Sequence, residues 1–206
     1  MVLENLDQQL ASGHSSLPSV NRRLMNAKSA QEARVLLAKF GRTVHSSSLT
    51  WERTIAFLRQ TTKMKVILKG IMTAEDAALA VEHGVDAILV SNHGGRQLDA
   101  TCSTIEALPA IVATVKSAIP IIMDGGIHSG ADVFKAIALG ASFVHIGRPA
   151  LWGLAYNGHE GVETVLNNLE RELSRTMALA GVTRISDISP ECLGVRSSNG
   201  FGMARL

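Results

Sequence analysis

The pattern that most limits the fold of this chain is a repeat of two segments, Thr73–Ser91 and Ser129–Gly147. Each begins with a residue that can cap a helix, has a glycine eleven residues later and ends an apolar run seven residues after that glycine. Helices and strands therefore alternate with short connections, which predicts a parallel sheet with right-handed crossovers. An open doubly wound sheet and a (β/α)8 barrel both fit this pattern. The GxGxxG turn typical of dinucleotide-binding sheets is absent from the sequence, which weakens the first alternative.

Four short apolar runs predict the strands, and Thr73, Ser103 and Ser129 predict the helix starts between them. Residues 1–60 are expected to be a mostly helical or irregular lead-in. One helix is predicted in NAKSAQEARVLLAKFG, ending at Gly41, and a second from about Thr50. Residues 61–190 are expected to form the α/β unit and residues 191–206 an irregular tail. The expected strands cover residues 65–69, 85–90, 120–123 and 142–146, and the last helix is expected over 160–180.

Composition excludes several classes of protein. The chain has 206 residues, 46% of them hydrophobic, and a net charge of +2. Such a chain can build one sizeable core, and its scattered basic residues give no nucleic-acid-binding stripe. It contains no run of 18 apolar residues, so no membrane span is expected. Cys102 and Cys192 lack metal-ligand spacing, so we expect no metal site and an intracellular, reducing location. The C-terminal Ala204-Arg205-Leu206 resembles the Ser-Lys-Leu peroxisomal address, and the cytoplasm is the alternative location.

Polar residues and glycines follow each predicted strand, at the edge of a parallel sheet where ligands bind. His93 can accept a proton near neutral pH, and Arg96 can bind a carboxylate through two hydrogen bonds. A backbone anion site is expected at Gly126 and Gly147, with Arg148 and the N-terminus of the helix that begins near Ser129. His83, His145 and His159 are expected to be structural. The candidate site residues at the four strand ends are Lys69; Ser91, His93 and Arg96; Asp124 and Gly126; Gly147 and Arg148.

The segments KGIMTAEDAALAVEHGVDAILVSNHGGRQLD and DGGIHSGADVFKAIALGASFVHIGRP carry a family resemblance. They resemble the C-terminal half of the FMN-dependent 2-hydroxy acid oxidases and dehydrogenases, which include glycolate oxidase. The resemblance implies a TIM (β/α)8 barrel and FMN as cofactor. It places Lys69 beside the flavin pyrimidine edge and Ser91 against the flavin. It also implies that His93 is the catalytic base and Arg96 the clamp for the substrate carboxylate.

The same resemblance implies that Asp124 and Gly126 contact the ribityl chain and phosphate, and that Gly147 and Arg148 clamp the phosphate. His128 would also contact the cofactor, although the family usually has arginine at this position. The implied reaction oxidises a small 2-hydroxy acid to the 2-oxo acid. Hydride and carbanion routes both remain open, as do oxygen, a quinone or a cytochrome as the electron acceptor.

The sequence has too few strands for a complete barrel. A (β/α)8 barrel typically takes about 250 residues, and only four βα units are predicted here. We therefore expect an incomplete barrel with two open sheet edges, from a truncated chain, from two copies that pair, or from a relic of little activity. Open edges favour homo-oligomers. The alternative to an enzyme is a catalytically impaired fragment that binds FMN or another phospholigand, or that serves in assembly.

Overall fold

A computed structural model describes residues 26–44, 48–196 and 203–205, and the chain divides into two compact units, Met1–Thr50 and Trp51–Leu206. In the first unit, helix α3 (Ala30–Val44) begins after Ser29, whose hydroxyl accepts a hydrogen bond from the Glu32 amide at 3.1 Å. The helix continues through Gly41, so the predicted end at this glycine is wrong. A single glycine lowers helix stability by only about 1 kcal/mol, which is too little to end a helix by itself.

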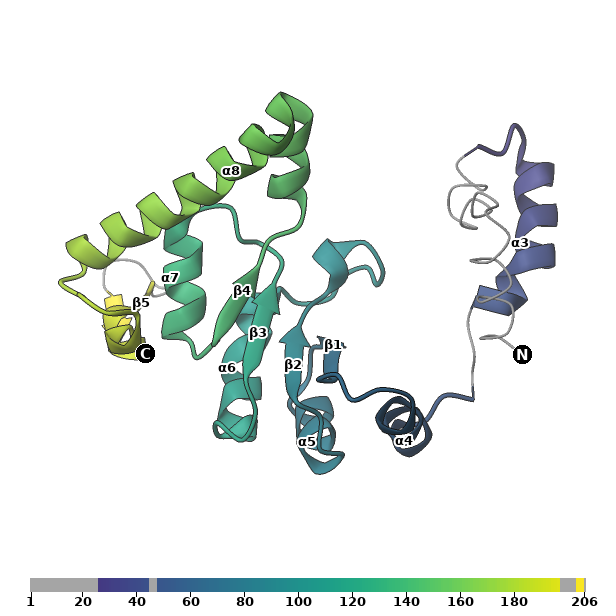
Figure 1. The fold of residues 1–206 in the computed structure, drawn as a ribbon, viewed down its shortest axis with the longest axis horizontal. Helices are drawn as coiled ribbons and strands as arrows, with labels where there is room; N and C mark the ends of the chain where they lie inside the picture. The colour runs from purple at the N-terminus through teal and green to yellow at the C-terminus, as the bar shows by residue number, and fades with distance from the viewer. Residues whose placement is uncertain (1–25, 45–47, 197–202, 206) are drawn as a thin grey trace. The chain divides into compact units, whose positions relative to one another are not determined.

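The second unit contains a four-stranded parallel sheet in the order β1-β2-β3-β4, shown in Figure 1. Each strand pairs with the next one along the chain, and a helix follows each strand, which confirms the predicted α/β fold of a half barrel. Within the described residues, β1 and β4 pair on one side only. The elements, in order, are α4 (Trp51–Thr61), β1 (Ile67–Ile71), α5 (Ala74–Glu82), β2 (Ala87–Val90), α6 (Thr104–Val115), β3 (Ile121–Asp124), α7 (Gly130–Ala138), β4 (Phe143–His145) and α8 (Arg148–Leu179).

The hydrophobic core lies between one face of this sheet and helices α5, α6 and α7. Strand residues Ile88, Val90 and Met123 are almost fully buried there, together with Leu108 and Ile111 of α6. Because side chains alternate across a strand, the next residues point to the opposite face. That face carries Ile67 on β1 and Phe143 on β4, which are 49% and 63% exposed. The helices therefore cover one face, and the other is the inner face of an open half barrel.

The predicted capping residues begin all three helices between the strands. The Thr73 hydroxyl accepts the Asp76 amide at 3.1 Å, and Ser103 and Ser129 form capping boxes with Glu106 and Asp132. These caps fix where each strand connection ends. They therefore set the length of the loop between each strand and the next helix, and these loops line the edge of the sheet.

The Asp86 carboxylate lies just before β2. It accepts one backbone hydrogen bond and forms two ion pairs, which connect this strand to α4 and to the residues before β1. Its carboxylate accepts the Val66 amide at 2.8 Å and pairs with Arg59 at 2.7 Å and Lys65 at 3.0 Å. These partners hold the pKa of Asp86 well below its ordinary value of 3.8, and the hydrogen bond from the Val66 amide has the largest effect. The charged carboxylate therefore stabilises this corner of the fold.

Helix α8 is longer than predicted because it begins at Arg148, with Pro149 in its first turn. The helix bends at Asn157 and Gly158, and its two arms meet at Gly153 and Gly161. A Cβ atom on Gly161 would lie 1.9 Å from the Gly153 carbonyl oxygen, so this close approach requires glycine. The sequence predicts only the second arm.

The C-terminal segment contains more regular structure than the predicted irregular tail. Two 3₁₀ turns, Ile185–Asp187 and Pro190–Cys192, precede strand β5 (Gly194–Arg196), which pairs antiparallel with β6 (Met203–Arg205). Strands of three residues are too short to show a periodic pattern in the sequence. Among the described helices, none has the length and apolar character required to cross a membrane.

Candidate functional site

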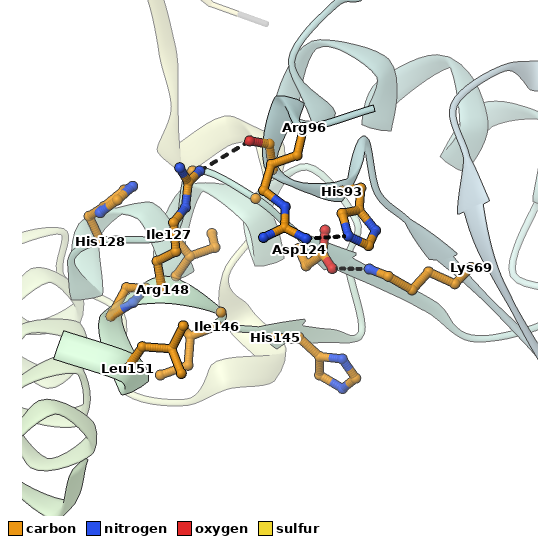
Figure 2. A pocket seen from close by; sticks show the side chains of 15 residues that line it. Lys69, His93, Arg96, Asp124, Ile127, His128, His145, Ile146, Arg148 and Leu151 are labelled. Atoms are coloured by element: carbon orange, nitrogen blue, oxygen red, sulfur yellow. Dashed lines mark hydrogen bonds and ion pairs between the residues drawn. The ribbon is translucent and has the colours of Figure 1, made fainter. Parts of the chain in front are cut away.

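A cavity of about 330 Å³ lies at the carboxyl ends of the four parallel strands (Figure 2). Most of the residues predicted from the sequence line it, although they are up to 79 positions apart, from Lys69 to Arg148. Parallel strands place their carboxyl ends at one edge, which explains this convergence. The cavity is lined by Lys69, His93, Gly94, Arg96, Asp124, Gly125, Gly126, Ile127, His128, His145, Ile146, Gly147, Arg148, Pro149 and Leu151.

Lys69 links three strands through its ammonium group. It lies inside β1, not at its end as predicted, and Gly70 follows with φ +103° where the pairing with β2 shifts register. Its Nζ donates to the Ser91 hydroxyl at 2.7 Å and forms an ion pair with Oδ2 of Asp124. Ser91 does not line the cavity surface, since its side chain is buried beneath the lysine. The second Asp124 oxygen, Oδ1, is buried without a hydrogen-bond partner in the part of the chain described.

His93 and Arg96 lie in the turn after β2. His93, Gly94 and Gly95 all have left-handed φ values, and Asn92 closes the turn by accepting the Gly95 amide at 3.2 Å. Nη2 of Arg96 lies 3.1 Å from Nε2 of His93. Because a guanidinium can only donate, Nε2 is the acceptor in this contact, and the proton of a neutral ring is on Nδ1. The lone pair that a base needs is therefore directed toward Arg96.

Arg148 is the first residue of α8 and contacts the turn that carries His93. Its Nη2 donates to the Gly94 carbonyl oxygen at 3.1 Å, and a Cβ on Gly94 would lie 3.2 Å from the same nitrogen. Gly147 precedes it as the N-cap of α8 and has an exposed backbone. Both residues line the cavity just after β4, whereas Lys69 lines it from β1.

The glycine turn after β3 leaves space for a ligand. Gly125 and Gly126 have φ values of +86° and +75°, and the Thr104 hydroxyl holds the turn by donating to the Gly125 carbonyl at 3.2 Å. A Cβ on Gly126 would meet no atom within 4 Å. A second cavity of about 380 Å³ lies on the other side of this turn, and Gly126, His128 and Arg148 line both cavities.

The N-terminus of α7 is not available to an anion, contrary to the sequence-based prediction. The Asp132 carboxylate accepts the amides of His128 and Ser129 at 3.2 and 3.0 Å, and Glu172 accepts the Gly130 amide at 2.8 Å. Burial favours a higher pKa for Asp132, but the hydrogen bonds from Ser129 and His128 and the charge of Lys135 outweigh it and lower the pKa. Two carboxylates thus already bind this helix end.

His145 was assigned a structural role from the sequence, but it is exposed and lines the cavity. The sequence alone did not show which face His145 occupies, because it stands in the same apolar run as Val144, which packs against the core. His83, in contrast, stacks on Trp51 with ring centroids 5.8 Å apart, which agrees with its expected structural role.

Comparisons with known proteins agree with this arrangement. Residues 3–195 match the family model of the FMN-dependent dehydrogenases. The chain is 52% identical over 147 residues to a 2-hydroxyacid oxidase of Dictyostelium discoideum, covering 71% of this chain and 38% of that protein. It is 49% identical over 147 residues to 2-hydroxyacid oxidase 2 of Rattus norvegicus, covering 71% and 41%.

Solved structures give the same result. A mandelate oxidase variant with the monooxide FMN adduct is similar with a TM-score of 0.64 and 48% identity, over 67% of this chain and 44% of that one. The chain spans about two fifths of the length of the curated relatives it matches. The family-model match covers most of the chain, and the chain therefore belongs to the FMN-dependent dehydrogenase family.

Proposed function

We propose that this chain forms the FMN-binding and proton-accepting part of an enzyme that oxidises a small 2-hydroxy acid to the 2-oxo acid. The observation that supports this function best is the meeting of Lys69, His93, Arg96 and Arg148 at one cavity. A 2-hydroxy acid substrate requires a base and a guanidinium that binds its carboxylate. A phosphorylated cofactor requires a further guanidinium that binds its phosphate.

The cavity residues fit FMN. The buried Oδ1 of Asp124 lacks a partner among the described residues, and a hydroxyl of the ribityl chain can donate to it. The phosphate would be bound by Arg148, by the imidazole of His128 and by the open backbone at Gly126 and Gly147. The Lys69 ammonium would lie beside the ring. When bound, FMN supplies the two-electron acceptor that the side chains of this protein lack.

His93 and Arg96 would have different roles toward the substrate, His93 as the base and Arg96 as the group that binds the carboxylate. Arg96 has five N–H groups and can bind the substrate carboxylate through two of them, which would turn the guanidinium away from Nε2 of His93 and free its lone pair. This places the hydroxyl on the neighbouring carbon near Nε2 of His93, which accepts its proton. The 3.1 Å distance between the two side chains supports this pairing, since it brings the base and the clamp within reach of one small substrate.

Flavin binding and flavin reduction test the proposal separately. Purified protein should quench the fluorescence of added FMN, and a panel of glycolate, lactate and mandelate should bleach the bound flavin in the absence of air. His93→Gln should lose bleaching and retain FMN affinity, while His159→Gln, at an exposed position in α8, should behave as the unsubstituted protein. Equal loss of binding and bleaching in His93→Gln would contradict the role of His93 as base.

A second candidate function is a catalytically impaired phospholigand-binding or assembly fragment. The exposed Ile67 and Phe143 on the inner face of the two edge strands favour it, because such a face is stable when covered. Two copies that pair β4 with β1 could supply the cover. Light scattering that gives a dimer, together with FMN binding and no bleaching by any acid of the panel, would support this function over the enzymatic one.

Peroxisomal import is a separate proposal based on Ala204-Arg205-Leu206. A fluorescent protein that ends in this tripeptide should collect in peroxisomes, and replacing Leu206 with Ala should leave it in the cytoplasm. The same diffuse distribution for both fusions would refute the import signal.

A further inference from the structure

The His145 imidazole faces the strand-end cavity but has no part in the function proposed above. It is an exposed side chain of β4, while its neighbour Val144 points the other way and packs against the core. Within the described residues, no hydrogen bond holds this ring. A polar ring that lines a cavity and makes no hydrogen bond there is available to a ligand.

The sheet register places His145 beside Asp124. The two residues are partners in the pairing of β3 with β4, and neighbouring strands are separated by about 4.8 Å. Both side chains point to the inner face, so His145 belongs to the layer of the carboxylate whose Oδ1 lacks a partner. Gly147 and Arg148 follow just after this strand, as the N-cap and the first residue of α8.

The two side chains assigned to the phosphate, Arg148 and His128, lie apart from His145. Figure 2 shows Arg148 and His128 together on one side of the cavity, with the His145 ring apart from both. A ligand whose phosphate is held by Arg148 and His128 would therefore present an uncharged part to His145. In FMN this part is the ribityl chain or the ring, both of which carry hydrogen-bonding atoms.

We propose that His145 is an additional binding residue that hydrogen-bonds the uncharged portion of the flavin. The proposal rests on the FMN-binding function and deepens it. It assigns Asp124 and His145, at the ends of β3 and β4, to the polyol and ring, and Arg148, at the start of α8, to the phosphate.

Parallel titrations with FMN and riboflavin test this assignment, since riboflavin lacks the phosphate. His145→Phe and His145→Ala both remove the polar atoms but differ in volume, and His145→Gln keeps a donor and an acceptor. We expect the first two to weaken FMN and riboflavin alike, each about tenfold, as for the loss of one hydrogen bond, and His145→Gln to stay within about threefold. Arg148→Met should weaken FMN alone, and His159→Phe should change neither affinity.

Four results would overturn the assignment. Unchanged affinities in His145→Phe and His145→Ala would exclude a polar contact, and a loss confined to FMN would place His145 at the phosphate. If the unsubstituted protein bound neither flavin, the FMN-binding function would itself fail, and this inference with it. Ligand-free thermal unfolding of each variant separates a lost contact from a lost fold, and a His145→Gln variant as weak as His145→Ala would indicate packing alone.

Discussion

Replacing Lys69 with methionine should destabilise the protein even without a ligand. The ammonium joins β1 to Ser91 after β2 and to Asp124 of β3, and methionine keeps the length of the side chain without these contacts. The Asp124 side chain is only 19% exposed, and its Oδ1 already lacks a partner among the described residues. The substitution therefore leaves a largely buried carboxylate with neither oxygen bonded to a side chain of the sheet.

The expected magnitude follows from the exposure of the pair. Exposed ion pairs contribute about 0–1 kcal/mol, and breaking a fully buried pair costs about 3–5 kcal/mol. The Lys69 side chain is 45% exposed, so solvent screens part of the interaction. We expect Lys69→Met to lower the free energy of unfolding by about 1–2 kcal/mol, between these two limits.

Urea denaturation of the ligand-free protein at neutral pH measures this loss. Lys63→Met is the matched control, because Lys63 is exposed beside the same strand, and it should change the stability by less than about 0.5 kcal/mol. Combining Lys69→Met with Asp124→Asn should cost less than the sum of the two single changes, since they remove the same interaction. Additive losses, or a Lys69→Met variant as stable as the control, would refute the bridging role of Lys69.

Other substitutions test the rest of the fold. Gly161→Ala should lower the free energy of unfolding by about 1–3 kcal/mol in urea, because the new Cβ would lie 1.9 Å from the Gly153 carbonyl oxygen, while Asn167→Ala on the exposed side of α8 should not. Gly94→Ala should lower the thermal midpoint, since φ at this position is +67° and the left-handed region costs about 1–2 kcal/mol for other residues. The depressed pKa of Asp86 means that its stabilising effect is complete above its ordinary value of 3.8 and is lost as the pH falls below it. Asp86→Asn should therefore reduce the loss of stability between about pH 5 and pH 2.5, measured by thermal unfolding, and an unchanged acid profile would contradict this.

Features of the fold that depend on local sequence were predictable. Apolar runs gave the four strands, and the hydroxyls of Thr73, Ser103 and Ser129 gave the helix starts, because caps and burial patterns act within a few residues. The meeting of Lys69, His93, Asp124 and Arg148 at one cavity was also predictable, since parallel strands place their ends at a common edge.

Features that depend on tertiary contacts were not predictable. The capping box at Ser129 was predicted. Its consequence was not, because the Asp132 carboxylate accepts the amides that were expected to bind an anion. The long α8 helix depends on the meeting of Gly153 and Gly161, a backbone contact that neither glycine signals by itself. His145 was missed because a lone histidine in an apolar strand does not show which face of the sheet its side chain occupies. Only the register, which pairs it with Asp124, places it on the cavity side.

Amide chemical shifts of isotopically labelled protein, followed during addition of FMN, test most directly whether the strand-end cavity is the flavin site. If Lys69, Asp124 and Arg148 surround the cofactor, the largest shifts should occur at Gly94, Gly126 and Gly147, which come from three different loops of the cavity wall. Lys69→Met combined with Arg148→Met should abolish these shifts. Saturable FMN binding that shifts amides elsewhere and leaves these three glycines unchanged would contradict the proposed site.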